Sequence, residues 1–263
     1  MSEQFARIRD FFKKENIECY SVLPIDKATV INERLMPKDA KSVVIFLIPY
    51  YTNEYQNRNV SLYAVSRDYH LYIKQLQSRF SCDDGFYRFF ADTSPIDERQ
   101  AALYAGLGVK GQNRLLINEK YGSYIFLGSI ITDVVFDEDE YAHEFAKKDC
   151  KNCGLCKKNC AFLGGKRDFC LSELNQRKKV TDEELSFIRS HKIIWGCDDC
   201  QTVCPYNKDI PVTPIEFFHK DTLPCITQQL IENMSDEIFK ERAYSWRGKN
   251  VILRNLAQDG ENK

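Results

Sequence analysis

The chain has 263 residues, enough for one or two domains, and its 43% hydrophobic and 29% charged content is typical of a globular protein. Its 37 Lys and Arg against 38 Asp and Glu give a formal net charge of −1, which excludes a whole-molecule attraction to nucleic acid. No apolar run reaches the length of a membrane span and the N-terminus lacks a signal-peptide core, so we expect a cytoplasmic protein with no membrane partner.

The first 80 residues predict two helices and one buried strand. Apolar side chains recur at helical spacing over residues 4–15 and again over residues 61–80, which predicts a helix in each segment. Between them lies the continuous apolar run "SVVIFLIPYY" (42–51), which is rich in β-branched residues and predicts a buried central strand.

A strand, a helix and a second strand are expected next. "GFYRFFAD" predicts a short strand that ends at Asp92. In "SPIDERQAALYAGLG", Ser94 is the expected N-cap and Pro95 the first helical residue, and the glycines at the end stop the helix. "SYIFLGSIITDVVF" (123–136) predicts the second strand. The alternation of helices and strands predicts an N-terminal α/β domain.

The chain changes character after residue 136. "DEDEYAHEFAKKD" (137–149) predicts a charged linker, and the chain after Pro224 is again helical in pattern. Residues 147–192 hold twelve Lys and Arg against six Asp and Glu, which indicates either a solvated face or a surface that faces a polyanion. We therefore predict an α+β protein of three regions, an α/β domain, a cysteine-rich domain and a helical C-terminal segment, over residues 1–145, 146–222 and 223–263.

Eight of the eleven cysteines form one ordered pattern. The spacing C-x2-C-x2-C-x3-C runs from Cys150 to Cys160, and Cys170 is followed by C-x2-C-x3-C-P ending at Cys204. Disulfides are rare in the cytoplasm, so this pattern favours metal or redox chemistry. The spacing is that of a two-cluster bacterial ferredoxin, in which the last cysteine of each motif serves the other cluster. Cys19, Cys82 and Cys225 stand outside the pattern and are expected to be buried small hydrophobes.

Two [4Fe–4S] clusters with crossed ligands are therefore expected. The first would be held by Cys150, Cys153, Cys156 and Cys204, and the second by Cys160, Cys170, Cys197 and Cys200. The separation of Cys170 from its motif, and Ala161 where a proline is common, depart from the simple pattern without removing a ligand. The alternative is a pair of zinc sites, but zinc usually takes two separated C-x2-C pairs.

Residues 91–133 form a second informative stretch. Asp92 is expected at a strand end just before a helix, where a carboxylate can be catalytic or can simply be a capping or surface group. The glycines of this stretch indicate that the backbone approaches a neighbour closely, namely Gly106, Gly108, Gly111, Gly122 and Gly128.

The motifs of this stretch resemble those of the epoxyqueuosine reductase family. The similarity lies in "DTSPIDERQAALYAGLG", "LLIN", "YGS", "FLG" and "ITD", with "SRDYH" before them and "GCDDCQTVCP" and "ILRN" after them. The resemblance covers about residues 40–256 and implies a cobalamin-dependent iron–sulfur enzyme. Its N-terminal α/β domain would bind cobalamin, as in cobalamin-processing proteins and reductive dehalogenases, and a ferredoxin-like domain would hold two clusters. The reaction implied is reduction of epoxyqueuosine to queuosine in the tRNA anticodon, with electrons from an external low-potential donor.

The resemblance also implies roles for single residues. Asp92 matches the family's proton donor, a role that needs partial burial to favour the protonated carboxyl. Arg99 matches a contact to tRNA. "DYHLYI" departs from the D-x-H-x-x-G motif that ligates cobalt, because Ile73 replaces the glycine, so base-off cobalamin without a histidine ligand is expected. The implied cobalamin contacts are Ser61, Asp92, Leu116, Glu119 and Leu127.

The match has limits near the chain ends. The family usually continues past "ILRN" into helical repeats that help to bind tRNA, whereas this sequence stops at Lys263, so the resemblance implies a short form with reduced tRNA-binding equipment. Three alternatives remain open at this point. They are an epoxyqueuosine reductase acting on tRNA, a related reductase of a small molecule or organohalide, and a non-catalytic corrinoid carrier or electron relay.

Overall fold

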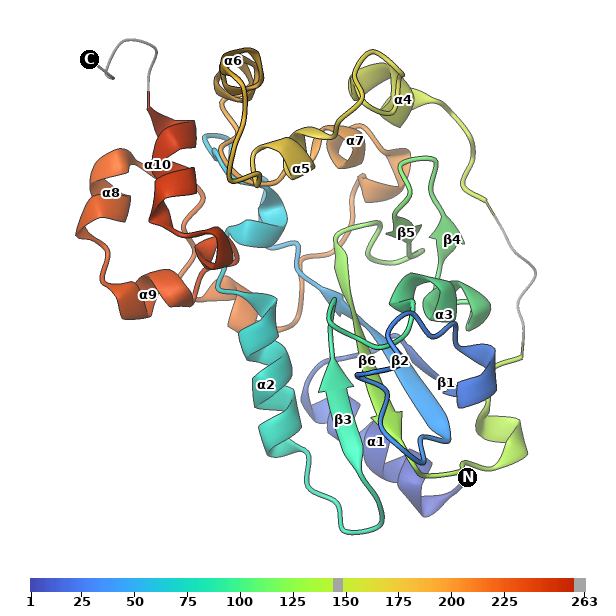
Figure 1. Ribbon diagram of the computed structural model, residues 1–263. Coiled ribbons are helices and arrows are strands. Elements are labelled where there is room, and N and C mark those ends of the chain that lie inside the picture. Colours follow the sequence, from blue (N-terminus) through green and yellow to red (C-terminus); the bar gives the residue numbers. More distant parts are fainter. Residues whose placement is uncertain (144–148, 258–263) are drawn as a thin grey trace. The chain divides into compact units, whose positions relative to one another are not determined.

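The computed structural model describes residues 1–143 and 149–257 and divides into two compact units (Figure 1). Each unit combines segments that are far apart in the sequence, which the three consecutive predicted regions did not anticipate. The predicted boundary at residue 145, part of the predicted linker and the last six residues lie outside the described residues. The first unit comprises Met1–Tyr50, Tyr69–Cys153 and Tyr206–Ile215, and the second comprises Tyr51–Asp68, Gly154–Pro205 and Glu216–Lys263.

A four-stranded antiparallel sheet organises the first unit. Its order is β1-β2-β6-β3, so β2 and β6 are central and β1 and β3 are the edges. Every residue of β2 is buried, as the continuous apolar run predicted. All three predicted strands are confirmed. The strands are β1 (Tyr20–Pro24), β2 (Ser42–Pro49), β3 (Tyr87–Phe90) and β6 (Ile125–Thr132), and a separate hairpin joins β4 (Val109–Lys110) to β5 (Leu116–Ile117).

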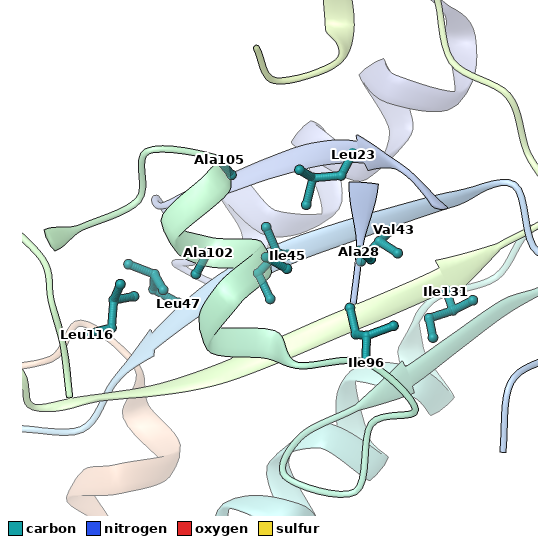
Figure 2. Packing of buried hydrophobic residues seen from close by; sticks show 11 residues of the cluster. Leu23, Ala28, Val43, Ile45, Leu47, Ile96, Ala102, Ala105, Leu116 and Ile131 are labelled. Carbon is teal, nitrogen blue, oxygen red and sulfur yellow. The ribbon is translucent and has the colours of Figure 1, made fainter. Parts of the chain in front are cut away.

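One face of this sheet packs against α3 (Glu98–Tyr104), as Figure 2 shows. Side chains of alternate strand residues point to the same face, so Ile45 and Leu47 of β2 meet Ala102 of the helix. Small alanines on the helix allow its backbone to approach the strands closely. This packing fixes the height of α3 above the sheet and so the position of the loop that precedes it.

Aromatic packing characterises the first unit as well. α1 (Glu3–Lys14) forms where the apolar stripe predicted a helix, with Ser2 as N-cap, and it buries Ile8 and Phe12. The Phe12 ring lies 5.0 Å from that of Phe46 on β2. Such ring pairs add to the stabilisation that comes from burial of apolar area.

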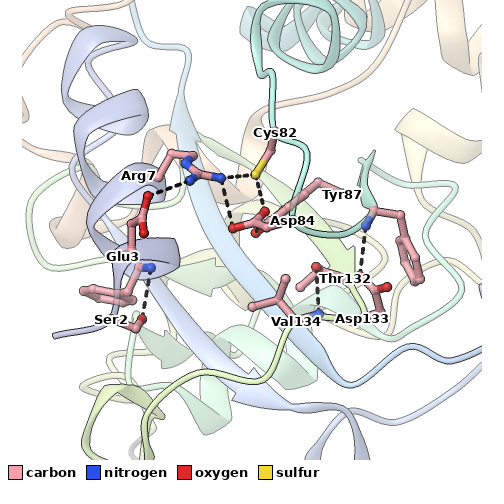
Figure 3. A network of polar contacts seen from close by, with 11 residues as sticks. Ser2, Glu3, Arg7, Cys82, Asp84, Tyr87, Thr132, Asp133 and Val134 are labelled. Carbon is pink, nitrogen blue, oxygen red and sulfur yellow. Dashed lines mark hydrogen bonds and ion pairs between the residues drawn. The ribbon is translucent and has the colours of Figure 1, made fainter.

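Polar contacts of Arg7 tie α1 to the loop before β3 (Figure 3). Its guanidinium pairs with Asp84 at 3.0 Å and with Glu3 at 3.2 Å, and it also donates to the Cys82 thiol. Cys82 is therefore a half-buried polar partner, and the expectation that it is a buried hydrophobe is wrong. Cys225 is exposed, which corrects the same expectation there.

The second predicted helix is much shorter than expected. α2 covers Tyr69–Arg79, while Leu62–Ala64 forms only a short 3-10 turn. The expected start at residue 61 is wrong because Ser61 is in extended backbone whose N–H donates to the Trp195 carbonyl at 2.8 Å. A long-range backbone pairing thus overrides the local helical spacing.

The start of α3 also differs from the prediction. Its N-cap is Asp97, whose side chain accepts the Gln100 N–H at 2.9 Å, and not Ser94. The Ser94 hydroxyl instead lies 2.9 Å from that of Ser129 on β6. Asp and Ser are similarly good caps, so the contact to the neighbouring strand decides between them.

Short helices make up the second unit. The helical pattern after Pro224 is confirmed by its last three helices. Within the described ranges, no helix has both the length and the apolar character that spanning a bilayer would require. The helices are α4 (Leu155–Asn159), α5 (Leu171–Leu174), α6 (Asp182–His191), α7 (Asp199–Thr202), α8 (Gln228–Asn233), α9 (Asp236–Lys240) and α10 (Lys249–Leu256).

Candidate functional site

Asp92 lies in the loop between β3 and α3, with its backbone in the left-handed region at φ 58°. Asp and Asn adopt this conformation more readily than other residues with a side chain, at a modest conformational cost. The Asp92 side chain is exposed. The expectation of partial burial is therefore wrong for the structure as described, and Asp92 stands at the surface of the first unit.

Two side chains hold Asp92 in place. The Tyr69 hydroxyl donates to Oδ2 of the carboxylate, and the Tyr69 ring stacks on Phe126 with centroids 4.0 Å apart. Below the loop, Oε2 of Glu98 accepts the Asp92 N–H at 3.0 Å. One partner therefore orients the carboxylate and the other orients the backbone that carries it.

Glu98 is the buried carboxyl of this site, with 7% of its surface exposed. Its Oε1 accepts a hydrogen bond from the Ser129 hydroxyl at 2.8 Å. Burial raises the pKa of Glu98 to about 7, because the charged form loses hydration, while the hydrogen bonds from Ser129 and Asp92 oppose that rise. Glu98 is therefore the site's carboxyl that changes charge near neutral pH.

The pKa of Glu98 predicts a pH dependence of stability. The folded chain binds this proton more tightly than the unfolded chain, whose glutamate pKa is about 4.5, so stability is complete below pH 4.5 and falls as the pH rises to about 7. The expected fall is about 3 kcal/mol in the free energy of unfolding. Denaturant unfolding between pH 4.5 and 8 measures it. The Glu98→Gln variant should lack this pH-dependent fall in the free energy of unfolding, whereas Glu33→Gln, at an exposed glutamate, should retain it. Equal pH profiles for the wild type and both variants would contradict the prediction.

The other residues of the first unit that are predicted to contact cobalamin or tRNA are either packed against the core or exposed. Leu116 is 4% exposed and packs in the core beneath α3, and Leu127 is half-buried against the same core. Glu119 and Arg99 are exposed, and the Arg99 guanidinium donates to the Arg114 carbonyl at 2.6 Å. Near the end of β3, the Asp92 carboxylate is exposed. On the neighbouring strand β6, the side chains of Phe126 and Leu127 are half-buried.

Several glycines of the stretch approach other parts of the same unit. A Cβ at Gly128 would collide with the Phe46 ring, and one at Gly108 would lie 2.6 Å from the Ile117 carbonyl oxygen. Gly122 combines φ 58° with close contact to Asn207. The expected close approach of backbone is confirmed at these positions, and the neighbour in each case is the chain itself.

Ser61 belongs to the second unit and is fully buried. Its hydroxyl donates to Oδ1 of Asp198 at 2.6 Å, and the Leu62 N–H donates to Oδ2 at 2.8 Å. Arg58 pairs with Oδ2 at 2.7 Å. Burial raises the pKa of Asp198, and the Arg58 charge opposes this rise. Because Asp198 lies between Cys197 and Cys200, this network anchors the cysteine loop to residues 58–62.

The thiols of the expected second cluster all belong to the second unit. Cys160 follows α4 directly, Cys170 is the N-cap of α5, and Cys200 is in α7. Burial raises the pKa of the Cys200 thiol to about 12, and the nearby Cys160 and Cys170 thiols add to that rise. Burial also raises the pKa of Cys197, which has Cys170 as its neighbour. Cys156, a predicted ligand of the first cluster, also contributes to the rise at Cys200, so thiols predicted for both clusters affect the same cysteine.

The predicted cluster ligands are present as thiols in the structure. All eight patterned cysteines are free thiols. Among the residues that the structure describes, no three His, Cys, Asp or Glu side chains converge on one point where a metal ion could sit. Cys150 and Cys153 lie in the first unit, in the chain that leads to α4.

Three of these residues were not predicted from the sequence. Tyr69 lies in "SRDYH", Glu98 in "DTSPIDER" and Asp198 in "GCDDC", and none of these motifs by itself assigns a role to that residue. Each of the three is an acid or a hydroxyl group within or beside a sequence motif. Its hydrogen-bond partner lies 23 or more positions away in the chain, so the sequence does not show which residues pair.

Comparison with known proteins decides the family. A family model described as "Epoxyqueuosine reductase QueG, DUF1730" matches residues 31–93. The epoxyqueuosine reductase of Lactococcus garvieae is 32% identical over 259 residues, which cover 86% of this chain and 71% of that protein. This chain belongs to the epoxyqueuosine reductase family.

Solved structures agree with the family in fold. The epoxyqueuosine reductase from Streptococcus thermophilus superposes with a TM-score of 0.73 at 22% identity, over 97% of this chain and 80% of that one. An epoxyqueuosine reductase crystallised with an epoxyqueuosine-modified tRNA-Tyr stem loop gives 0.74 at 21% identity, over 96% and 80%. Together with the sequence relatives, they confirm the predicted family and its mixed α/β fold.

Proposed function

We propose that this member of the epoxyqueuosine reductase family is an oxidoreductase that reduces epoxyqueuosine to queuosine in tRNA. The observation that carries the proposal is the position of Asp92. The acid of the family motif "DTSPIDER" lies at the surface, on a loop whose backbone and carboxylate are both held by hydrogen bonds. A carboxyl presented in this way is accessible to a large substrate that arrives from solution, and the burial that its protonated form needs would come from the bound substrate.

The cofactors proposed are two [4Fe–4S] clusters and base-off cobalamin. Cys150, Cys153, Cys156 and Cys204 would hold the first cluster, and Cys160, Cys170, Cys197 and Cys200 the second. The division follows the ferredoxin spacing of the cysteines, in which the last cysteine of each motif serves the other cluster. When bound, the clusters and the corrinoid supply the two electrons that the reaction needs.

The residues proposed to contact cobalamin differ in how accessible their side chains are. The side chains of Asp92, Glu119 and Leu127 are accessible at least in part. Leu116 is buried in the first unit and would support the site from behind, whereas Ser61 is buried in the second unit and is proposed as a contact from its motif position alone. We assign the cobalamin-binding role to residues 1–145, the cluster-binding role to residues 146–222 and a supporting helical role to residues 223–263.

The chain's own residues would contribute proton delivery and orientation. Removal of an epoxide oxygen as water takes two electrons and two protons and leaves a carbon–carbon double bond. The protonated Asp92 carboxyl would give one proton to the departing oxygen, the second proton would come from solvent, and Tyr69 would hold the Asp92 side chain toward that oxygen. Arg99, exposed one turn along from the loop, would contact the tRNA.

The proposed partner is the anticodon stem-loop of a tRNA, in the cytoplasm, with an external low-potential protein or small molecule as electron donor. The excess of positive charge within residues 147–192 of the sequence supports contact with phosphates, which supply most of the nonspecific affinity for nucleic acid. Binding through these charges should weaken steeply as salt is raised.

A direct assay tests the proposal. The protein is purified without oxygen, its iron, sulfide and cobalt are measured, and it is incubated with a reductant and tRNA that contains epoxyqueuosine. Mass spectrometry of the nucleoside digest is expected to show queuosine formed at the expense of epoxyqueuosine. A loaded protein that leaves epoxyqueuosine unchanged would refute the tRNA reaction. Turnover of an organohalide by the same sample would then favour the related reductase.

The crossed cluster ligands predict a long-range effect of one substitution. Cys204→Ala should disturb the cluster built on Cys150, although the two residues are 54 positions apart. Paramagnetic resonance of the reduced protein measures this, and its spectrum should match that of Cys153→Ala. A spectrum that matched Cys170→Ala instead would show that the ligand division is wrong. Cys225→Ala, at an exposed cysteine outside the pattern, is the control.

A further inference from the structure

Glu98 is a buried carboxyl beside the Asp92 loop that the proposed reaction does not use. We propose that Glu98 is a positioning residue, which holds the backbone of Asp92 in its left-handed turn and so aims the Asp92 carboxylate. The inference rests on the proposed function only for the role of Asp92, because the contact itself is a property of the fold. The Asp92 N–H donates to Oε2 of Glu98 at 3.0 Å.

The loop is anchored along most of its length by contacts that do not involve Glu98. The Pro95 carbonyl accepts from the backbone N–H groups of Ile31 and Asn32 at 2.8 and 3.0 Å. The hydroxyl of Ser94 lies 2.9 Å from that of Ser129. These contacts fix residues 94 and 95, but the left-handed turn is two residues earlier. There, Glu98 binds the Asp92 N–H from inside the unit.

Glu98 is itself held on two rigid elements. It is the first residue of α3, directly after the N-cap Asp97. Its second oxygen accepts from Ser129 on the central strand β6, at 2.8 Å. The carboxyl therefore bridges the strand and the loop, and its planar shape presents one acceptor to each. A residue whose own position is fixed in this way can transmit that position to the group it binds.

Two substitutions at Glu98 differ in whether the new side chain can accept a hydrogen bond from the Asp92 N–H. Glutamine has the same planar group, and its carbonyl oxygen can accept the Asp92 N–H while its amide donates to the Ser129 hydroxyl. Leucine has a similar volume and no acceptor, so it leaves the Asp92 N–H without its buried partner. The Glu98→Gln and Glu98→Leu variants thus separate the hydrogen bond from the filling of space.

Amide hydrogen exchange of the complete chain, measured at Asp92 by NMR without added cofactors, is the decisive measurement. Exchange at Asp92 is expected to be at least about 10-fold faster in Glu98→Leu than in the wild type, because the turn opens locally more often. Glu98→Gln should restore slow exchange.

In the loaded enzyme, Glu98→Leu should lower kcat for epoxyqueuosine-containing tRNA by about 10-fold or more and leave KM nearly unchanged, because a displaced proton donor affects chemistry rather than binding.

Wild-type exchange at Asp92 in Glu98→Leu would overturn the proposal, as would rapid exchange in Glu98→Gln. If Glu98→Leu does not fold, Ser129→Ala decides the question, because it removes the hydrogen bond that holds Glu98. Ser129→Ala also removes the partner of the Ser94 hydroxyl, so Ser94→Ala is measured beside it. Faster exchange at Asp92 in Ser129→Ala than in Ser94→Ala supports the proposal, and equal exchange in the two variants refutes it. A wild-type enzyme without activity on the tRNA would refute the proposed function, while the exchange result would still decide the role of Glu98.

Discussion

Replacing Asp92 with Asn is expected to lower kcat by about 10²- to 10⁴-fold, the usual contribution of a positioned general acid. Asn has the same shape, tolerates the left-handed turn at φ 58° and can still accept a hydrogen bond from Tyr69. The variant therefore loses the transferable proton without losing the loop geometry. The rate of queuosine formation under saturating tRNA measures the effect.

Cofactor content separates this effect from a damaged site. Iron, sulfide and cobalt in Asp92→Asn should equal those of the wild type, because the cysteines and the loop are unchanged. Asp83→Asn, at an exposed acid in the loop before β3, should keep full activity. Full activity of Asp92→Asn would remove Asp92 from the proposed role and would leave the proton to another donor or to water.

The Asp198→Ala variant is expected to lose about 3–5 kcal/mol of unfolding free energy, because removal of one partner leaves a buried charge uncompensated. The side chains of Asp198 and Arg58 are 1% and 14% exposed and pair at 2.7 Å. Ser61 and Gln201 also lose their acceptor, since they donate to Asp198 at 2.6 and 3.0 Å. Denaturant unfolding of anaerobically purified protein measures the loss.

The position of Asp198 predicts an effect on the cluster as well. Because it lies between Cys197 and Cys200, Asp198→Ala should also reduce the iron and sulfide bound at the second cluster. Asp199→Ala, at the neighbouring residue, is a matched control. Asp199 lies in the first turn of α7, and its replacement should lower the free energy of unfolding by well under about 1 kcal/mol. Replacing Arg58 and Asp198 together with apolar residues should cost less than the sum of the single changes. Equal losses at Asp198 and Asp199 would contradict the assigned role.

Local pattern was sufficient for the strands β2, β3 and β6 and for α1, α3 and the C-terminal helices, but it did not indicate β1, β4, β5 or the short helices α4–α7. The apolar run of β2 needs burial on both faces wherever it lies, and the sheet supplies that burial at its centre. The helix expected over residues 61–80 failed at its first half, and the N-cap moved from Ser94 to Asp97. In both cases a contact to a distant segment was stronger than a local preference, and local spacing carries no information about such contacts.

The sequence alone determined the family, the mixed α/β character and the spacing of the eight cysteines, because motif order and residue type are properties of the chain itself. It also selected Asp92 from the motif that surrounds it. Only the tertiary structure decided which groups hold that residue and the cysteine loop. Glu98 meets Ser129 across 31 positions and Ser61 meets Asp198 across 137. Burial turns these distant polar groups into obligatory partners, since a buried carboxyl must find donors within the fold, and the fold decides which donors are near.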